Sequence, residues 1–176
     1  MKTIVIYNSQ TGFTKRYAEW IAEATGAECV TLSAAKELDL NGYDAIVFGS
    51  RVCAGSVDKI KWLKANINNR SNRSAKKLAV FCVGGSPMNS PDIAPFIERN
   101  FTDSERERAK VFYCPGGFNY EKMPIPSKLM MKMFSKMLNA KKDKTESEEI
   151  MAEMISSSYD ISDRKYIEPI LQYLKS

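Results

Sequence analysis

The sequence contains no histidine. This absence excludes a Ser-His-Asp triad, a Cys-His nucleophile pair and any metal site built on imidazole ligands. Four cysteines are present, at Cys29, Cys53, Cys82 and Cys114, but no two of them form a C-x-x-C pair. Their spacing predicts reduced thiols, with neither a disulfide framework nor a metal site.

Several other signals are missing from the sequence as well. No apolar run approaches the roughly 20 residues that a membrane-spanning helix needs. The chain begins with Met-Lys and passes directly into an apolar stretch, so we expect no signal peptide and a cytoplasmic location. The G-x-x-x-x-G-K-S/T phosphate loop and the G-x-G-x-x-G dinucleotide fingerprint are absent. No arginine follows Cys53, Cys82 or Cys114 at the sixth position, which excludes a low-molecular-weight phosphatase loop.

Length and charge narrow the class of protein further. The 176 residues fit one domain with a sizeable core, so we expect a single domain over residues 1–176. The net charge of +5 indicates an anionic partner such as a membrane surface. No nucleic-acid partner is expected, because no recognition motif accompanies the charge.

The first fourteen residues carry the most specific signal. Residues 2–8 form an apolar run rich in β-branched side chains, and a polar turn and a helical pattern follow at once. The turn offers the hydroxyls of Ser9, Thr11 and Thr14, and Gly12 allows close backbone approach. Hydroxyls, backbone N–H groups and a helix N-terminus at one point favour a phosphate. The alternative is an ordinary strand-to-helix turn capped by a threonine.

The rest of the chain repeats this alternation of strand and crossover. Apolar strands are predicted at residues 28–32, 45–49, 78–83 and 110–114, and helices at about 14–24, 58–67, 91–100 and 163–174. Ser90 and Ser162 are the predicted caps of the last two helices, and Pro169 either kinks the final helix or marks its start. Residues 68–77 are expected to be a solvated connection, residues 104–108 to be exposed, and residues 118–159 to be an insertion after the fifth strand. Continuous apolar strands indicate a three-layer α/β fold, a doubly wound five-stranded parallel sheet with order 2-1-3-4-5.

The turn S-Q-T-G-F-T resembles the flavodoxin phosphate loop, T/S-x-T-G-x-T, which holds the phosphate of FMN. The resemblance implies a flavodoxin-like fold with FMN as cofactor, bound at the carboxyl edge of the sheet. The loops after strands three and four would then hold the flavin ring. The predicted cofactor-binding residues lie in three segments: Ser9, Gln10, Thr11, Gly12, Phe13 and Thr14; Ser50, Arg51, Val52, Cys53, Ala54 and Gly55; and Gly84, Gly85, Ser86, Pro87 and Met88.

Neither ring loop contains an aromatic residue, although many flavodoxins place the ring between a Trp and a Tyr. Val52, Cys53, Pro87 and Met88 are therefore expected to line the ring and to leave one face more open. Arg51 either neutralises the flavin or is a plain surface arginine, and Cys53 is either a small packing residue or a redox-active thiol. Cys82 and Cys114 lie in apolar strands and are predicted to be core residues. No catalytic side chain is expected.

The insertion contains a basic, methionine-rich stretch. On a helix over residues 127–142, Lys128, Lys132 and Lys136 share a polar face, and methionines, leucines and Phe134 fill the remainder. This pattern favours peripheral membrane contact or quinone contact. The alternatives are a flap over the flavin and packing against a partner chain, including a homodimer. Residues 144–153 turn acidic and favour a second short helix.

The whole chain resembles the menaquinone-dependent protoporphyrinogen oxidase branch of the flavodoxin superfamily. The features that carry this resemblance are M-K-T-I-V-I-Y, S-Q-T-G-F-T, Y-D-A-I-V-F-G-S-R-V, and G-G-F-N-Y followed by the basic methionine-rich helix. It implies an FMN-dependent oxidoreductase or electron-transfer protein that passes electrons from a reduced substrate to a quinone or a redox-protein partner. Haem-precursor oxidation is one version of this function. A soluble flavodoxin that only carries electrons is another, and a flavin-free interaction domain is a third. A location on the inner face of the membrane is compatible with the first version.

Overall fold

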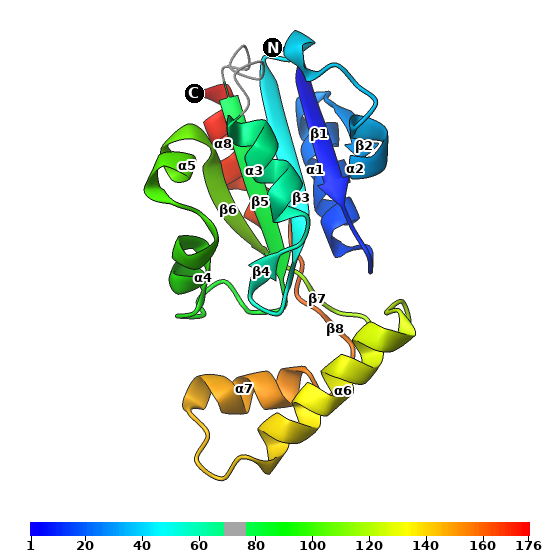
Figure 1. The fold of residues 1–176 in the computed structure, drawn as a ribbon, viewed down its shortest axis with the longest axis vertical. Helices are drawn as coiled ribbons and strands as arrows, with labels where there is room; N and C mark the ends of the chain where they lie inside the picture. Colours follow the sequence, from blue (N-terminus) through cyan, green and yellow to red (C-terminus); the bar gives the residue numbers. More distant parts are fainter. Residues whose placement is uncertain (69–76) are drawn as a thin grey trace.

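A computed structural model describes residues 1–68 and 77–176 of the chain, and these residues form a three-layer α/β fold (Figure 1). The parallel strands are β1 (Thr3–Asn8), β2 (Glu28–Thr31), β3 (Ala45–Cys53), β5 (Lys77–Gly84) and β6 (Lys110–Pro115). They lie in the order β2-β1-β3-β5-β6, and each neighbouring pair is parallel. The predicted fold class and the 2-1-3-4-5 strand order are therefore confirmed. The short strand β4 (Ser56–Val57) pairs antiparallel to β3.

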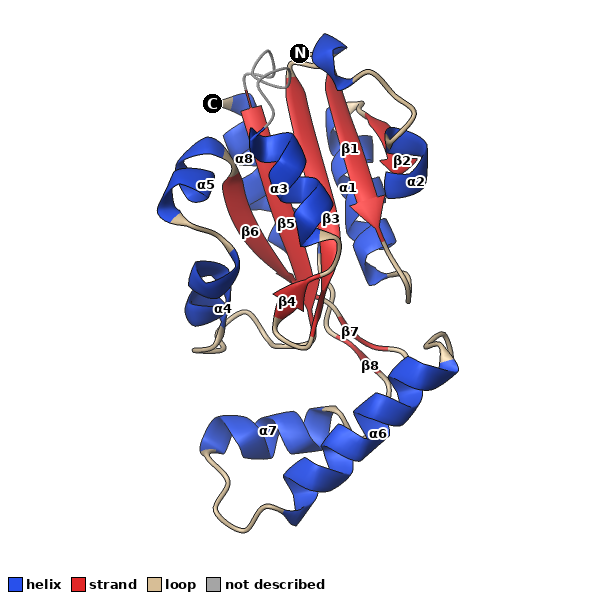
Figure 2. Ribbon diagram, viewed as in Figure 1, coloured by secondary structure: helices blue, strands red, loops and turns tan. Residues whose placement is uncertain are grey.

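Both faces of the sheet are buried, as continuous apolar strands require. Along β3, Ala45 and Val47 pack into one core cluster, and Ile46 and Phe48 pack into the other. The first cluster lies under α1 (Phe13–Thr25), the 3₁₀ helix η3 (Arg164–Ile167) and α8 (Glu168–Lys175). The second lies under α2 (Leu32–Ala35), the 3₁₀ helix η1 (Leu40–Gly42), α3 (Ile60–Asn68) and α4 (Ile93–Asn100). Figure 2 shows the strands as an inner layer between the helices.

Some predicted helix boundaries are wrong. Helix α4 begins at Ile93, and the residue that precedes it is Asp92, so Ser90 is not its cap. Residues 104–108, expected to be exposed, belong to α5 (Asp103–Arg108), which Thr102 opens with a capping box, and Glu105 among them is buried. Asp163, and not Ser162, caps η3. Pro169 stands in the first turn of α8, which confirms that it marks the start of the final helix.

The insertion is a helical hairpin on a two-stranded neck. Strands β7 (Gly117–Phe118) and β8 (Tyr159–Asp160) pair antiparallel, and helices α6 (Ile125–Ala140) and α7 (Glu146–Met154) lie between them in the sequence. Leu138 of α6 packs with Ala152 and Ile155 in a small core of its own. The hairpin extends from the end of the sheet toward which β1 points, and the two chain termini lie at the opposite end (Figure 1). Both predicted insertion helices are present, with slightly shifted bounds.

Two further expectations concern the connection after α3 and the absence of a membrane-spanning helix. Most of the predicted connection over residues 68–77 falls outside the described residues. Among the helices that are described, none combines the length and apolarity needed to cross a bilayer.

Candidate functional site

The turn between β1 and α1 forms an open cradle of hydrogen-bond donors. Gly12 has a φ of 103° and occupies the position before the first helical residue, where no side chain caps the helix. The Gly12 N–H donates to the Ser9 hydroxyl at 3.2 Å. The N–H groups of Phe13, Thr14 and Lys15 belong to the first helical turn and have no acceptor within the helix. A side chain built onto Gly12 would meet nothing within 4 Å, so the space over the turn is open.

Thr14 is placed unusually for a hydroxyl residue in the first turn of a helix. Only 2% of its surface is exposed. Within the described part of the chain, no protein group forms a hydrogen bond with its hydroxyl, and no side-chain oxygen there is both fully buried and unpartnered. The hydroxyl therefore reaches the protein surface through a narrow opening at the turn. It is available to an acceptor outside the protein.

The second predicted segment is a β-hairpin and not the loop expected from the sequence. Strand β3 continues to Cys53, and Cys53 pairs with Ser56 of β4. The two residues between them, Ala54 and Gly55, have φ values of 48° and 76°. Positive φ at both positions is what a tight type I′ turn requires, and it is compatible with the twist of the two strands. Asn100 of α4 holds this turn, because its amide donates to the Gly55 carbonyl at 2.9 Å.

Arg51 connects the first two segments. Its guanidinium donates to the Gln10 side chain at 2.5 Å and to Asp58 at 3.0 Å. Asn8 also donates to Asp58, at 3.1 Å. Burial raises the pKa of Asp58, but these hydrogen bonds lower it by more, so the carboxylate is charged at neutral pH. Arg51 is therefore neither free nor a plain surface residue: it forms an ion pair beside the turn.

The third segment, Gly84 to Met88, is covered by aromatic side chains that the sequence analysis did not assign to the site. The Tyr159 hydroxyl donates to the Gly85 carbonyl at 2.7 Å, and the Tyr113 hydroxyl donates to the Ser86 carbonyl at 3.0 Å. A side chain at Gly85 would lie 2.7 Å from both the Phe118 ring and the Tyr159 hydroxyl, so only glycine fits there. Burial raises the pKa of Tyr159, which keeps this donor protonated.

These aromatic residues come from the neck of the insertion. Phe118 in β7 and Tyr159 in β8 meet edge to face at 5.4 Å, and Phe118 stacks on Tyr120 at 6.5 Å. The signal in the sequence was the G-G-F-N-Y stretch, which follows the fifth strand directly. The carboxyl ends of parallel strands share one edge of the sheet, so aromatics after any of them lie near the site. Neither ring loop contains an aromatic residue, as the sequence shows, but the neck of the insertion places aromatic side chains beside the third segment.

The remaining predicted residues and the cysteines differ in how far they are exposed. Met88 is 46% exposed. Cys53 is partly exposed at the end of β3, and Cys82 and Cys114 are buried, as predicted for core residues. Burial raises the pKa of Cys82 to about 12, so this thiol stays protonated.

Comparison with known proteins gives a family and a set of structural likenesses. A flavoprotein from Lactobacillus acidophilus NCFM, solved in complex with FMN, is 19% identical, with a TM-score of 0.43 over 64% of this chain and 90% of that one. The Trp repressor binding protein of Bacillus subtilis is 18% identical, with a TM-score of 0.46 over 67% of this chain and 85% of that one. A flavodoxin from the domain Archaea is 18% identical, with a TM-score of 0.40 over 89% of this chain and all of that one. The search among curated proteins found no match. The sequence model of the flavodoxin domain matches residues 4–145, and the chain therefore belongs to the flavodoxin domain family.

Proposed function

We propose that this protein binds FMN at the carboxyl edge of its sheet, with the phosphate in the turn from Ser9 to Thr14. The observation that carries the proposal is the open turn at Gly12, where no side chain caps the helix and the nearby Thr14 hydroxyl has no partner in the described part of the protein. The backbone N–H groups of the turn and this hydroxyl are neutral donors, which suit an oxyanion at a helix N-terminus. Arg51 stands next to this turn through Gln10, but Asp58 balances its charge.

The ring of the flavin would lie between the hairpin at Ala54 and Gly55 and the segment from Gly84 to Met88. The hairpin offers its backbone at Gly55, where an added side chain would approach nothing closer than 3.6 Å, whereas aromatic side chains cover Gly84 and Gly85 in the other segment. Phe118 and Tyr159 supply the aromatic surface that the two segments lack. The Tyr159 hydroxyl occupies the Gly85 carbonyl, so this carbonyl is held in place by the neck of the insertion.

FMN supplies reversible two-electron chemistry when it is bound. The role of this chain would be to hold the cofactor, to set its orientation and to limit the access of water. The proposed function is that of an FMN-dependent oxidoreductase that takes electrons from a reduced substrate and delivers them to a quinone or a protein acceptor. Menaquinone-dependent oxidation of protoporphyrinogen is the more specific version, and it rests on the sequence resemblance alone. A flavodoxin that only carries electrons between proteins is the alternative.

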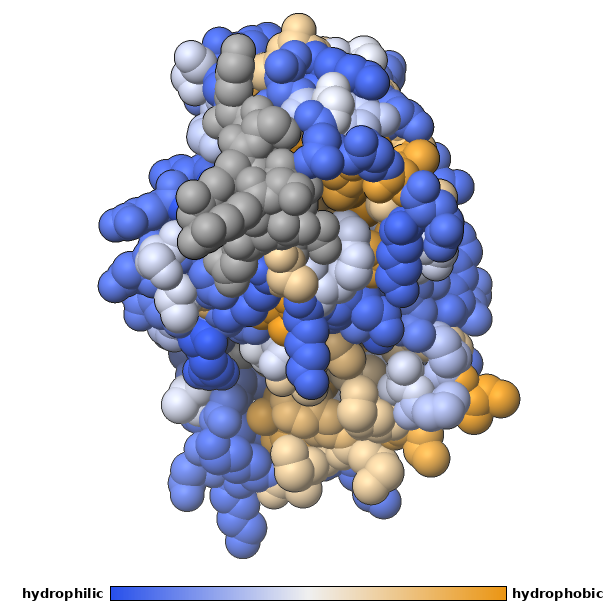
Figure 3. All heavy atoms as spheres, turned by 45° about the horizontal axis from the view of Figure 1, so that its top comes forward, coloured by the Kyte–Doolittle hydropathy of each residue, from blue (hydrophilic) through white to orange (hydrophobic). Residues whose placement is uncertain are grey.

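One surface favours the quinone version over a simple carrier. Six large apolar side chains of α6 are exposed: Ile125, Leu129, Met130, Met133, Phe134 and Met137. In Figure 3 pale and deep orange spheres gather over the end of the molecule where α6 lies. Because this apolar face is exposed, it is suited to an apolar partner. We propose peripheral contact with the inner face of a membrane, where quinones reside, and a second copy of the chain is the competing partner.

A flavin titration followed by turnover tests the proposal. The purified chain is stripped of cofactor, and FMN is added while the visible absorption spectrum and the quenching of flavin fluorescence are recorded. We expect saturable binding of one FMN per chain, with much weaker binding of riboflavin, which lacks the phosphate. The reduced holoprotein is then mixed with a menaquinone analogue in detergent or with a redox protein. Rapid oxidation by the quinone supports the oxidoreductase, oxidation by the protein alone supports the carrier, and absence of flavin binding refutes both.

A further inference from the structure

A groove lies in the insertion, apart from the proposed flavin segments. It has a volume of about 370 Å³ and runs between α6, the neck at Tyr120 and the end of α7. Its lining residues are Tyr120, Lys128, Lys132, Ser135, Lys136, Asn139, Ile155 and Ser156. None of these residues is acidic, and the whole of α6 contains no aspartate or glutamate. The groove therefore presents positive charge and hydrogen-bond donors.

The lysines of the groove are not compensated by the protein. In the described part of the chain, the side-chain ammonium groups of Lys128, Lys132 and Lys136 form no ion pair and no hydrogen bond, although α7 carries several glutamates. Lys141, just beyond α6, shows the contrast, because it pairs with Glu148 at 2.6 Å. Like charges one helical turn apart repel each other. A bound anion is therefore expected to stabilise this row of lysines by reducing their mutual repulsion.

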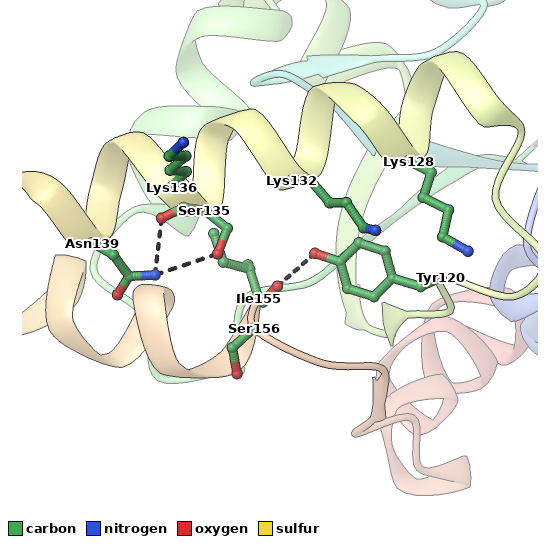
Figure 4. A pocket seen from close by; sticks show the side chains of 8 residues that line it. All are labelled: Tyr120, Lys128, Lys132, Ser135, Lys136, Asn139, Ile155 and Ser156. Atoms are coloured by element: carbon green, nitrogen blue, oxygen red, sulfur yellow. Dashed lines mark hydrogen bonds between the residues drawn. The ribbon is translucent and has the colours of Figure 1, made fainter.

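Figure 4 shows how the groove is arranged around Tyr120. Lys128 and Lys132 extend from α6 on the side where Tyr120 lies, and Lys136 points away from Tyr120. The Tyr120 hydroxyl donates to the Ile155 carbonyl at 2.5 Å, which fixes the ring as one wall. The two ammonium groups thus line the same groove, on the side of α6 where the Tyr120 ring lies.

We propose that this groove binds the oxyanion groups of a phosphate-type ligand through Lys128 and Lys132, with Lys136 as a weaker, more distant contributor. Ammonium groups are point donors that suit phosphate oxygens, and two of them match a ligand with at least two negative charges. The volume is large enough for a small ligand and not merely for a single ion. The ligand is either a free phosphate compound or the headgroup of an anionic lipid. This inference does not depend on FMN, since the groove shares no residue with the proposed flavin segments.

Titration calorimetry with pyrophosphate at low salt tests the inference on the full chain. The variant Lys128→Gln/Lys132→Gln removes both of these charges, and the matched control Lys122→Gln/Lys142→Gln removes two exposed charges outside the groove. We expect pyrophosphate affinity to fall at least about tenfold in the groove variant and by less than about twofold in the control. Lys136→Gln should have an intermediate effect. Circular dichroism checks that each variant is folded.

A second arm separates the two sources of the ligand. Sedimentation with phosphatidylglycerol vesicles is measured for the same variants, with phosphatidylcholine vesicles as reference. Groove-dependent binding of pyrophosphate supports a free phosphate ligand. Groove-dependent sedimentation without pyrophosphate binding supports a lipid headgroup. If neither ligand binds, or if the control variant loses as much binding as the groove variant, the inference is overturned.

Discussion

Replacement of Thr14 by valine tests whether the turn after β1 binds a phosphate. The substitution keeps the shape of a side chain that is 2% exposed and removes only its hydroxyl. No protein hydrogen bond to that hydroxyl is present in the described part of the chain, so folding should lose little. We expect the free energy of unfolding to change by less than about 1 kcal/mol, measured by urea denaturation of the cofactor-free protein.

The effect on FMN binding should be much larger than the effect on folding. A hydrogen bond to a charged group contributes about 1.5–3 kcal/mol, which corresponds to an increase of about 10- to 150-fold in the Kd of FMN. Riboflavin has no phosphate, so its Kd should be nearly the same for the wild type and for Thr14→Val. Comparison of the two ligands in the two proteins forms a thermodynamic cycle that isolates the hydroxyl–phosphate interaction.

Thr25→Val is the matched control at the other end of α1. Its hydroxyl donates to the Ile21 carbonyl at 2.7 Å, so its loss should reduce stability by about 0.5–1.5 kcal/mol and leave FMN affinity unchanged. The assignment of the phosphate to this turn is refuted if Thr14→Val leaves FMN affinity unchanged, or if it weakens FMN and riboflavin equally.

Three further predictions concern the frame around the site. Burial raises the pKa of Glu105, but hydrogen bonds from the Thr102 N–H and Lys64 lower this pKa by more. The contribution of Glu105 to stability is therefore present above its unfolded pKa of about 4.3 and is lost as pH falls through the lower folded value. Glu105→Gln should therefore cost about 1 kcal/mol at pH 7 and progressively less as pH falls below the unfolded pKa, by urea denaturation over a series of pH values. Gly49→Ala places a carbon 1.9 Å from the facing phenylalanine ring of β5. We expect the melting temperature to fall by several degrees, and an unchanged melting temperature would show that the ring can move aside. Tyr159→Phe removes the donor to the carbonyl after β5, and faster hydrogen exchange at the neck should follow, whereas unchanged exchange would contradict this role.

The fold could be predicted from the sequence because the patterns that indicate it are local and repeated. Each buried strand reads as a continuous apolar run, and each crossover reads as a helix with a single apolar stripe. The turn at Gly12 was equally readable, since its glycine, hydroxyls and helix start are consecutive in the chain. The errors at Ser90 and Ser162 are shifts of helix starts, where several neighbouring residues compete to cap the helix.

The hairpin at Ala54 could not be predicted from the sequence, because alanine rarely adopts the positive φ that a type I′ turn requires. Its conformation is supported by Asn100, which is 45 positions away from Gly55. Long-range contacts outweigh the local preference of one residue at such a position. The environment of Arg51 has the same origin, because Gln10 lies 41 positions before it in the chain.

The sequence by itself determined the buried strands and crossovers, the donor-rich turn and the basic helix of the insertion, because each depends on residues that are close together in the chain. The order of the strands followed from the fold class that this alternation indicates. Only the tertiary structure decided that Arg51 pairs with Asp58 and that Tyr159 holds the Gly85 carbonyl from 74 positions away. It also decided that Lys128 and Lys132 line one groove with Tyr120. These contacts depend on how separate elements pack, and the periodicity of a single element carries no information about which partner it meets.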